Sequence, residues 1–273
     1  LDLEKQDISL LAFGKLGSHE LNLSSDIDLV IVREDQVDPQ SCHPALKKFV
    51  STLSENTSFG FAYRVDFDLR PGGNSTPLTC NKKKFFSYFD EYLEAWNRLS
   101  FIRMRPLIGP EELNAQLYEY CRRHSFPRRL DFSVINEIKH IRQKINYQWR
   151  KANEPVDIKL SPGGIRDLEL FVHSLQVIYG GKDPKLQTSN MTNAIENLFN
   201  RKALKLEERD FLNRFYWDLR RIENLIHIEN DNHTYLLKPG FLKRIPHLEW
   251  DEKEFFANFR TCNEIVGDFF TEP

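Results

Sequence analysis

Two aspartates, separated by a single residue, stand directly in front of an apolar run. Asp26 and Asp28 lead into Leu29–Val32, a pattern that predicts a buried strand with acids at its start. Side chains two positions apart on a strand share one face, so the two carboxylates are expected a few ångströms from each other. Carboxylates that close repel unless a cation lies between them, and Mg²⁺ prefers such hard oxygen ligands. The spacing therefore predicts a metal-dependent nucleotidyl-transfer site.

A glycine turn just upstream supplies groups that can bind phosphate. Gly14 and Gly17 allow the backbone to approach a ligand closely, and Lys15 and Ser18 bring a positive charge and a hydroxyl. The turn is not a Walker A loop, because Leu16 follows the lysine where Ser or Thr is required. The turn and the acid pair are each weak signals whose simpler interpretation is solvated residues at a strand end, but together they favour a phosphate cradle.

A third acid lies on a second alternating segment. Residues 64–70 alternate between charged and apolar types, which predicts a strand with one buried face. Asp66 would then share the polar face with Arg64, Asp68 and Arg70. If this strand lies beside the one that carries Asp26 and Asp28, three carboxylates are available to hold two metal ions.

These motifs resemble a known family, the bifunctional glutamine synthetase adenylyltransferase/adenylyl-removing enzymes. The landmarks follow the family's order from about residue 10 to about residue 240. They are Gly14-Lys15-Leu16-Gly17, Glu20-Leu21-Asn22, Ser24-Ser25-Asp26-Ile27-Asp28, Tyr63-Arg64-Val65-Asp66, Leu69-Arg70-Pro71, Ala95-Trp96, Arg103, Arg105-Pro106, Asp157-Ile158-Lys159-Leu160, Pro162-Gly163-Gly164-Ile165-Arg166-Asp167, Glu169 and Leu219-Arg220-Arg221-Ile222-Glu223-Asn224.

The resemblance implies an activity. The family protein has two related halves, of which one attaches AMP to a tyrosine of glutamine synthetase and the other removes it by phosphorolysis. The motifs at 20–25, 63–66, 164–166 and 180–184 look more like the N-terminal, adenylyl-removing half. Inorganic phosphate would then attack the tyrosyl-AMP phosphorus and release ADP. Three alternatives remain open: the adenylylating half, a catalytically silent regulatory module, and a nucleotidyltransferase that acts on RNA.

The resemblance also implies roles for individual residues. Asp26 and Asp28 would be catalytic metal ligands for two Mg²⁺ ions, with Mn²⁺ as a substitute, and the catalytic Asp66 would be a third ligand or a base for the nucleophile. The nucleotide- or phosphate-binding set would comprise Gly14, Lys15, Gly17, Ser18, Ser25, Arg70, Arg103, Arg105, Lys159, Arg166 and Glu169. From the residues alone, Ser161-Pro162-Gly163-Gly164 before a helix is a second anion site or simply a helix start with an ion-paired first turn. Three positions depart from the family pattern: Asp68, Asn97 and His173.

The composition is that of an intracellular enzyme domain. The 273 residues carry a net charge of −2, which gives no global positive field for nucleic acid or anionic membranes. The four cysteines are too far apart for a zinc motif, and no stretch reaches the roughly 18 apolar residues of a membrane helix. We therefore expect a cytoplasmic protein. The expected partners are glutamine synthetase, ATP or ADP, inorganic phosphate and, for a full-length protein, a PII-type nitrogen signal protein.

The order of patterns predicts an α+β chain with two domains. Residues 1–110 are expected to form a nucleotidyltransferase-fold catalytic domain, with a mixed sheet and flanking helices. Residues 111–273 are expected to form an all-helical bundle, because apolar residues recur there at three- and four-residue steps. The start at Leu1 and the position of the methionines, Met104 and Met191, favour a piece of a longer protein that lacks its upstream helical part.

Overall fold

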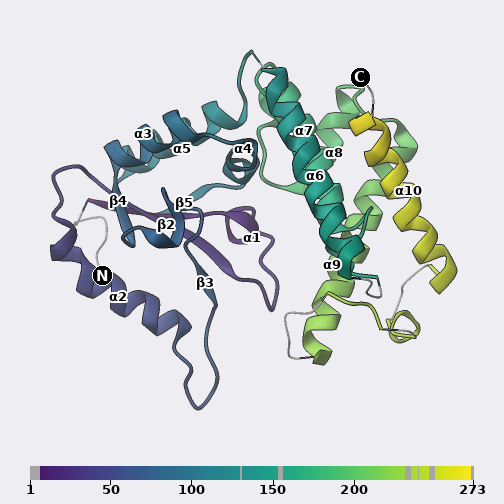
Figure 1. The fold of residues 1–273 in the computed structure, drawn as a ribbon, viewed down its shortest axis with the longest axis horizontal. Helices are drawn as coiled ribbons and strands as arrows, with labels where there is room; N and C mark the ends of the chain where they lie inside the picture. The colour runs from purple at the N-terminus through teal and green to yellow at the C-terminus, as the bar shows by residue number, and fades with distance from the viewer. Residues whose placement is uncertain are drawn as a thin grey trace. The chain divides into compact units, whose positions relative to one another are not determined.

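The computed structural model describes residues 7–129, 131–152, 156–230, 235–238, 240–245 and 250–271. It divides into two compact units, Leu1–Pro127 and Arg128–Pro273 (Figure 1). The division therefore falls later than the boundary at 110 that the sequence predicts. The difference is the helix α5 (Glu111–Ser125), which contributes Leu113 and Leu117 to the core of the first unit.

The first unit contains a five-stranded mixed sheet. Strand β1 pairs antiparallel with β2 and β5, whereas β3 and β4 pair parallel with the two ends of β2. The bounds of the strands are Ile8–Ala12 for β1, Ile27–Arg33 for β2, Val65–Asp66 for β3, Thr79–Asn81 for β4 and Arg105–Ile108 for β5. Strand β2 begins at Ile27, includes Asp28 and continues through the apolar run Leu29–Val32, so the predicted strand is confirmed.

Helices cover both faces of this sheet (Figure 1). Helix α2 (Pro39–Ser54) packs with the side chains of Leu10 and Ile31 on one face. Helices α3 (Lys82–Tyr92), α4 (Ala95–Ile102) and α5 enclose the other face. Because both faces are covered, β2 reads as a continuous apolar segment and not as an alternating one.

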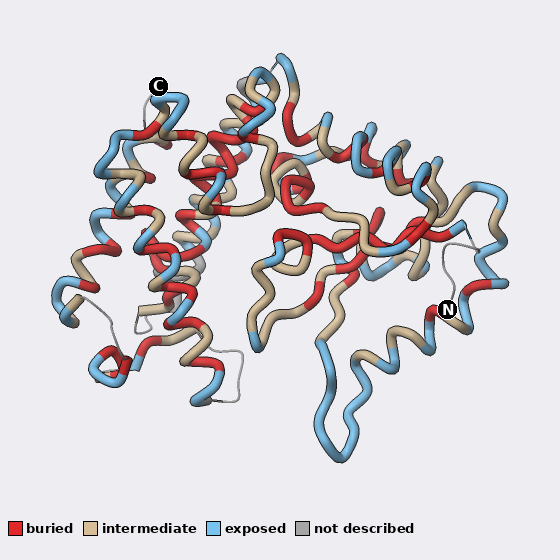
Figure 2. The backbone as a smooth tube through the Cα atoms, turned by 180° about the vertical axis from the view of Figure 1, so that it is seen from behind, coloured by how far each residue is buried: buried red, intermediate tan, exposed pale blue. Residues whose placement is uncertain are grey.

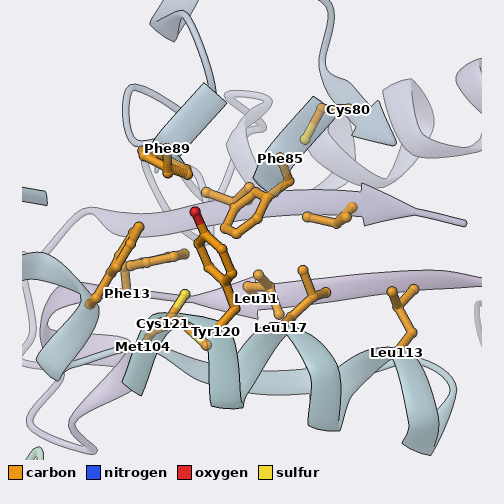
Figure 3. Close-up of a cluster of buried hydrophobic side chains, with 13 residues drawn as sticks. Leu11, Phe13, Cys80, Phe85, Phe89, Met104, Leu113, Leu117, Tyr120 and Cys121 are labelled. Carbon is orange, nitrogen blue, oxygen red and sulfur yellow. The ribbon is translucent and has the colours of Figure 1, made fainter. Parts of the chain in front are cut away.

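Aromatic rings fill the larger of the two cores (Figure 3). Phe85 and Phe89 of α3 meet edge to face with ring centroids 5.0 Å apart, and Phe89 meets Phe101 of α4 in the same way. The Tyr120 hydroxyl donates at 2.7 Å to a carboxylate oxygen of the exposed Asp90, so the polar end of this buried ring is satisfied at the edge of the core. Each fully buried ring stabilises the fold by about 1.5–3 kcal/mol. This core fixes α3, α4 and α5 against the strands that carry the site.

The second unit is helical in all of its described elements apart from a single bridge pair, Asp157 with Leu236. Helix α7 is buried at most of its positions and is central to the unit. The helix bounds are Phe132–Ala152 for α6, Ile165–Tyr179 for α7, Met191–Asn200 for α8, Leu206–Asn230 for α9 and Glu252–Thr271 for α10. Short 3-10 turns cover Gly73–Ser75 in the first unit, and Pro184–Leu186 and Leu242–Arg244 in the second. The α+β class predicted from the sequence is confirmed.

The four cysteines are free thiols, and all of them are buried. Burial raises the pKa of the Cys80 thiol to about 12, so it stays protonated at neutral pH. Among the described helices, none combines the length and the apolar character that a bilayer crossing would need.

Candidate functional site

The glycine turn forms a single helical turn, α1 (Gly14–Gly17), directly after β1. Its first residue has φ +54°, in the left-handed region that favours glycine. A Cβ placed on Gly14 would lie 2.2 Å from Oδ2 of Asp28. The Phe13 amide also donates to the Asp28 carbonyl oxygen at 2.9 Å. The turn and the second aspartate are therefore in direct contact.

The segment that enters β5 supports the other end of this turn. A Cβ on Gly17 would lie 1.7 Å from the carbonyl oxygen of Arg103, so only glycine fits there. The Arg105 guanidinium donates to the carbonyl oxygens of Leu16 at 2.9 Å and Gly17 at 3.3 Å. These contacts hold the turn in place.

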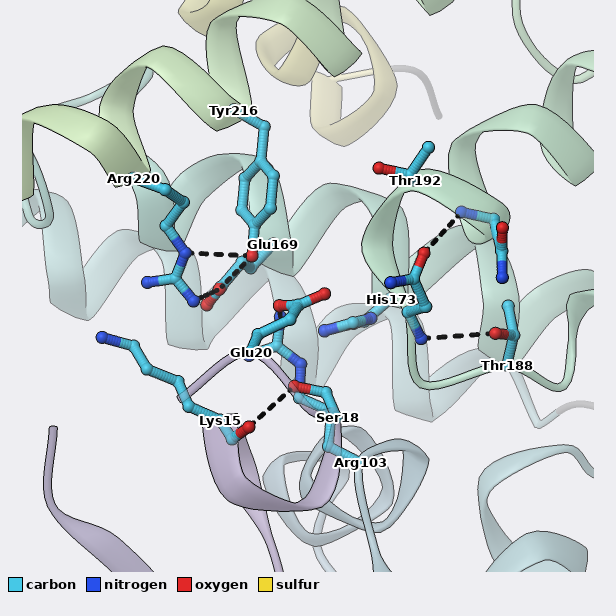
Figure 4. Close-up of polar contacts among 12 residues, drawn as sticks. Lys15, Ser18, Glu20, Arg103, Glu169, His173, Thr188, Thr192, Tyr216 and Arg220 are labelled. Atoms are coloured by element: carbon cyan, nitrogen blue, oxygen red, sulfur yellow. Dashed lines mark hydrogen bonds and ion pairs between the residues drawn. The ribbon is translucent and has the colours of Figure 1, made fainter. Parts of the chain in front are cut away.

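The Arg103 side chain lies inside the unit. It is 7% exposed, and its Nη2 lies 3.8 Å from Oε2 of Glu20, which is itself buried (Figure 4). Arg103 and Arg105 were both expected to bind phosphate. In the structure, the neighbour of Arg103 is the buried Glu20, and the neighbours of Arg105 are the carbonyl oxygens of the turn.

The hydroxyls of the cradle make local bonds. Ser18 is 2% exposed, and its Oγ donates to the Lys15 carbonyl oxygen at 3.3 Å (Figure 4). The Ser25 hydroxyl donates to Oδ1 of Asn22. The Lys15 side chain is half-buried at the turn. In this structure Ser18 and Ser25 shape the loop between α1 and β2.

Two of the three predicted carboxylates are neighbours on adjacent strands. Strands β2 and β3 run parallel, with Asp28 in register with Asp66. Residues in register on parallel strands place their side chains on the same face of the sheet. The Asp66 carboxylate accepts the backbone N–H of Asp68 at 2.7 Å. The strands that carry Asp28 and Asp66 therefore lie side by side, which is the condition that the sequence argument required.

Asp26 is bound by an arginine. Nε of Arg64 donates to Oδ1 of Asp26 at 2.6 Å, and Nη2 of Arg64 donates to the Ser24 hydroxyl at 3.2 Å. In the described part of the chain, no group of three or more His, Cys, Asp or Glu side chains is gathered closely enough to hold a metal ion. The expected three-carboxylate cluster is therefore not found among the described residues, where Arg64 is bonded to Asp26. The hard-oxygen donors and the adjacency of Asp28 and Asp66 suit Mg²⁺, and metal binding stays a prediction.

The second predicted strand is shorter than its alternation indicates. Strand β3 contains only Val65 and Asp66, so the prediction of a strand over residues 64–70 is wrong beyond that point. The Asp66 side chain takes the Asp68 N–H, and the Arg70 N–H turns back to the Phe67 carbonyl oxygen at 3.1 Å. Such local side-chain-to-backbone bonds compete with strand pairing.

Arg70 stabilises the loop that follows. Its side chain is 9% exposed, and it donates to the carbonyl oxygens of Phe67 and Thr76 at 3.0 Å each and to Oδ1 of Asn74 at 3.2 Å. Its placement is thus that of a loop clamp, although the sequence suggests a phosphate ligand.

The glycine loop of the second unit, residues 161–164, donates a backbone N–H to the buried Asp167 of the same unit. The Gly163 N–H donates to Oδ2 of Asp167 at 2.9 Å, and Arg142 donates to both carboxylate oxygens of Asp167. A Cβ on Gly163 would lie 2.1 Å from the Phe259 carbonyl oxygen in α10. The simpler alternative from the sequence, an ion-paired first helical turn, matches this arrangement.

Three further predicted residues belong to the second unit: Lys159, Arg166 and Glu169. Nζ of Lys159 donates to the Tyr235 hydroxyl at 2.9 Å and lies 4.1 Å from the ring centroid. Arg166 is exposed. Glu169 accepts from the Tyr216 hydroxyl at 3.4 Å and lies 3.5 Å from Nη2 of Arg220 (Figure 4).

The three departures from the family pattern have local partners. Oδ1 of Asn97 accepts the Glu94 N–H at 3.0 Å and caps the start of α4. Asp68 accepts from the Asn74 amide. Nδ1 of the buried His173 lies 2.8 Å from Oε1 of Gln176. Each departing residue therefore fits the fold through contacts within its own unit.

Sequence reasoning missed the part played by Arg64. The alternation placed Arg64 on the same face as Asp66, which was the available signal for an arginine beside the acids. The alternation could not predict that Arg64 pairs with Asp26. That pairing depends on the parallel register between the residue before β2 and the residue before β3. The Ile27 N–H donates to the Arg64 carbonyl oxygen at 2.9 Å and sets this register.

A mixed sheet with flanking helices, two in-register acids beside a glycine turn, and a following helical unit together define a nucleotidyltransferase domain joined to a helical domain. Comparison with known proteins gives the family. Residues 2–120 match the family model of glutamate-ammonia ligase adenylyltransferase, and residues 138–248 match that of GlnD PII-uridylyltransferase. Residues 2–120, most of the first unit, are therefore similar to the glutamate-ammonia ligase adenylyltransferase family, and the resemblance inferred from the motifs is confirmed.

Curated relatives extend the match over most of the chain. Bifunctional glutamine synthetase adenylyltransferase/adenylyl-removing enzymes from Shewanella loihica and Shewanella frigidimarina are each 34% identical, over 87% and 85% of this chain. The enzyme of the same description from Mesorhizobium japonicum is 32% identical over 88% of the chain. The chain spans about a quarter of the length of these relatives, 26% in each case.

Proposed function

We propose that this chain is a metal-dependent nucleotidyltransferase that acts on glutamine synthetase and removes AMP from its adenylyl-tyrosine by phosphorolysis. The observation that carries the proposal is the register of Asp28 with Asp66 beside the Gly14 turn. This arrangement lies within the residues that match the adenylyltransferase family.

The proposed reaction is an in-line displacement at phosphorus. An oxygen of inorganic phosphate attacks the phosphorus of the adenylyl group while the bond to the tyrosyl oxygen breaks. The tyrosyl oxygen leaves with the bonding electron pair and takes up a proton. The products are ADP and glutamine synthetase with an unmodified tyrosine residue. Such a displacement requires positioning and neutralisation of the charge on the phosphoryl oxygens.

The residues of the first unit suit these two tasks. Asp28 and Asp66, joined by Asp26 when it leaves Arg64, would hold Mg²⁺. The ions would supply charge neutralisation and a more nucleophilic phosphate oxygen. Lys15 and the backbone of the turn would orient the phosphoryl group, and the packing of Gly14 against Asp28 fixes the distance between turn and acid.

The experiment follows the fate of the AMP group. The chain is incubated with adenylylated glutamine synthetase and Mg²⁺, with and without inorganic phosphate, and ADP is separated from AMP. We expect ADP only in the presence of phosphate and little AMP transfer from ATP. The control is Asp28→Asn, which keeps the side-chain size and should lower turnover on the order of 10³-fold or more. Its melting temperature should stay equal or rise, because like-charge repulsion is relieved.

Two other outcomes correspond to the alternatives. Efficient AMP transfer from ATP to unmodified glutamine synthetase would assign the chain to the adenylylating activity, which the relatives' names also include. Absence of both reactions, together with no Mn²⁺ binding that depends on Asp28, would favour a silent regulatory module. Two observations favour this module: Arg64 is bonded to Asp26, and no group of three acids that could hold a metal is found among the described residues.

The second unit suggests a further partner for the full-length protein. Residues 138–248 match a model named for PII-uridylyltransferase, which supports a PII-type signal protein as a regulator. In this proposal the chain acts in the cytoplasm, together with glutamine synthetase and the signal protein.

A further inference from the structure

The segment between α2 and β3 exposes aromatic side chains on an ordered turn. Every residue from 54 to 63 is exposed, as the unbroken pale blue course of this loop shows (Figure 2). Phe59 is 100% exposed, and Phe61 and Tyr63 are 47% and 42% exposed. We call residues 57–63 the aromatic arm.

The tip of the aromatic arm is held by its own hydrogen bonds. The backbones of Thr57 and Gly60 exchange two bonds, at 2.9 and 3.0 Å. The Thr57 hydroxyl donates to the Gly60 carbonyl oxygen at 2.7 Å and accepts the Phe59 N–H at 3.1 Å. Gly60 has φ +92°, which favours glycine. Phe59 is thus presented by a formed turn, so its exposure is a property of the fold.

The base of the aromatic arm is tied to the candidate site. The Tyr63 N–H donates to the carbonyl oxygen of Leu53 in α2 at 2.8 Å, and the chain then enters Arg64 and β3. The Arg64 guanidinium lies 5.7 Å from the Phe61 ring centroid and bonds Asp26. One arginine therefore contacts both an aromatic residue of the arm and an acid of the site.

A fourth exposed apolar side chain lies on the segment that Arg64 bonds. Leu23 is 75% exposed and precedes Ser24, whose carbonyl and hydroxyl oxygens accept from Arg64. Phe59, Phe61, Tyr63 and Leu23 thus belong to two segments joined through Arg64. Exposed apolar groups that cluster on one surface mark interaction sites, and aromatic anchors dominate the energetics of such sites.

We propose that the aromatic arm, with Leu23, is the surface on which the protein substrate docks beside its adenylylated tyrosine. The inference rests on the proposed function, since it names how that site selects a protein. Phosphate is recognised by charges and hydrogen bonds, which these four side chains do not provide apart from the Tyr63 hydroxyl. An adenine ring could stack on an aromatic residue of the arm, and the small adenylyl-tyrosine substrate in the test separates that case from docking of a protein. A protein substrate extends well beyond its reacting tyrosine, so it can contact the arm while that tyrosine lies at the acids, which Arg64 joins to the arm.

The test separates docking from chemistry. The variant is Phe59→Ser with Phe61→Ser in the 273-residue chain. The matched control is Tyr118→Ser, which removes a 45% exposed aromatic ring from α5 of the same unit. For the double variant we expect KM for adenylylated glutamine synthetase to rise about tenfold or more, the loss typical of interface anchors. The KM for phosphate, the turnover of adenylyl-tyrosine amide as a small substrate, and the Mn²⁺ affinity should equal those of the control.

Two kinetic outcomes overturn the proposal. The first is an unchanged KM for the protein substrate. The second is an equal loss with the small substrate, which would make the arm a part of the catalytic fold. If sedimentation shows a wild-type dimer that the double variant abolishes with KM unchanged, the arm is a contact between copies of this chain and the proposal also fails.

Failure of the proposed function is recognised separately. If the wild-type chain releases no ADP, direct binding of adenylylated glutamine synthetase is measured instead. Binding that the double variant loses and Tyr118→Ser keeps supports the docking surface without the phosphorolytic chemistry. Binding equal in all three chains, or absent in the wild type, overturns it.

Discussion

Replacement of Gly14 by alanine tests whether the turn sets the position of the Asp28 carboxylate. Alanine at φ +54° incurs the cost of left-handed backbone, about 1–2 kcal/mol. Its Cβ would also lie 2.2 Å from Oδ2 of Asp28, whereas ordinary contacts begin at 3.4 Å. The carboxylate oxygen must therefore move by about 1 Å. It is the far end of a side chain, so it can move without displacing the backbone.

The two effects have different readouts. Backbone strain lowers the free energy of unfolding and the melting temperature, by about 3–6 °C for each kcal/mol in a unit of this size. Displacement of the carboxylate acts on metal binding and turnover. Mg²⁺ bonds oxygen at about 2.0–2.1 Å in a strict geometry, and a misplacement of about 1 Å costs on the order of 10²-fold in rate. We expect Gly14→Ala to weaken Mn²⁺ binding about tenfold or more.

Gly60→Ala is the matched control. Gly60 also has positive φ, +92°, but a Cβ there meets nothing within 4 Å. Both variants should lose similar stability in urea unfolding, and only Gly14→Ala should lose Mn²⁺ affinity by titration calorimetry. Equal Mn²⁺ affinity in the two variants would show that the contact between Gly14 and Asp28 does not set the metal site.

Three further predictions concern single contacts. Arg64→Gln removes the cation that holds Asp26, so Mn²⁺ affinity should rise severalfold, and unchanged affinity would exclude competition between arginine and metal. Burial and the nearby Arg123 and Arg98 lower the pKa of His124, so the unfolded chain binds the proton more readily. Stability should therefore fall as pH drops below about 6.5, and His124→Gln should show a shallower fall in urea unfolding between pH 7 and 5. Gly163→Ala, with φ +82° and a Cβ 2.1 Å from the Phe259 carbonyl oxygen, should destabilise the second unit more than Gly240→Ala, which has φ +74° in open space.

Periodic patterns predicted the helices of the second unit well. The apolar steps along residues 134–149, 168–179 and 212–226 correspond to α6, α7 and α9, although the side chain of Trp149 lies outside the described residues. These segments are long, and one buried face repeats at the helical period, so packing and local propensity agree. Strand β2 was predictable for a related reason, since helices on both faces of the sheet require a continuous apolar run.

Short segments whose course is set by side-chain-to-backbone bonds were not predictable in this way. The alternation over residues 64–70 predicts a strand, yet the strand ends when the Asp66 carboxylate binds the Asp68 N–H. The hydrogen bonds of Arg70 then fold the following loop back on itself. A pattern of polar and apolar residues contains no information about such bonds, because it records residue type and not the direction of donors. The amphipathic pattern of α5 likewise does not say which unit its apolar face packs on, and its place in the first unit comes from the structure.

The arginines of the first unit bear on how charge is neutralised in the proposed reaction. A family motif does not tell whether an arginine binds the substrate phosphate or stabilises the surrounding loop. Arg70 and Arg105 donate to carbonyl oxygens, and Arg103 lies buried beside Glu20. Arginines held by such contacts maintain the loop and the turn, and their release to a substrate would leave buried acceptors unsatisfied at about 1–3 kcal/mol each. Neutralisation of the phosphoryl oxygens would then depend on Lys15 and on metal at Asp28 and Asp66. A reaction with this division of roles should depend strongly on divalent metal, and the three arginine positions should affect stability before they affect the KM for phosphate.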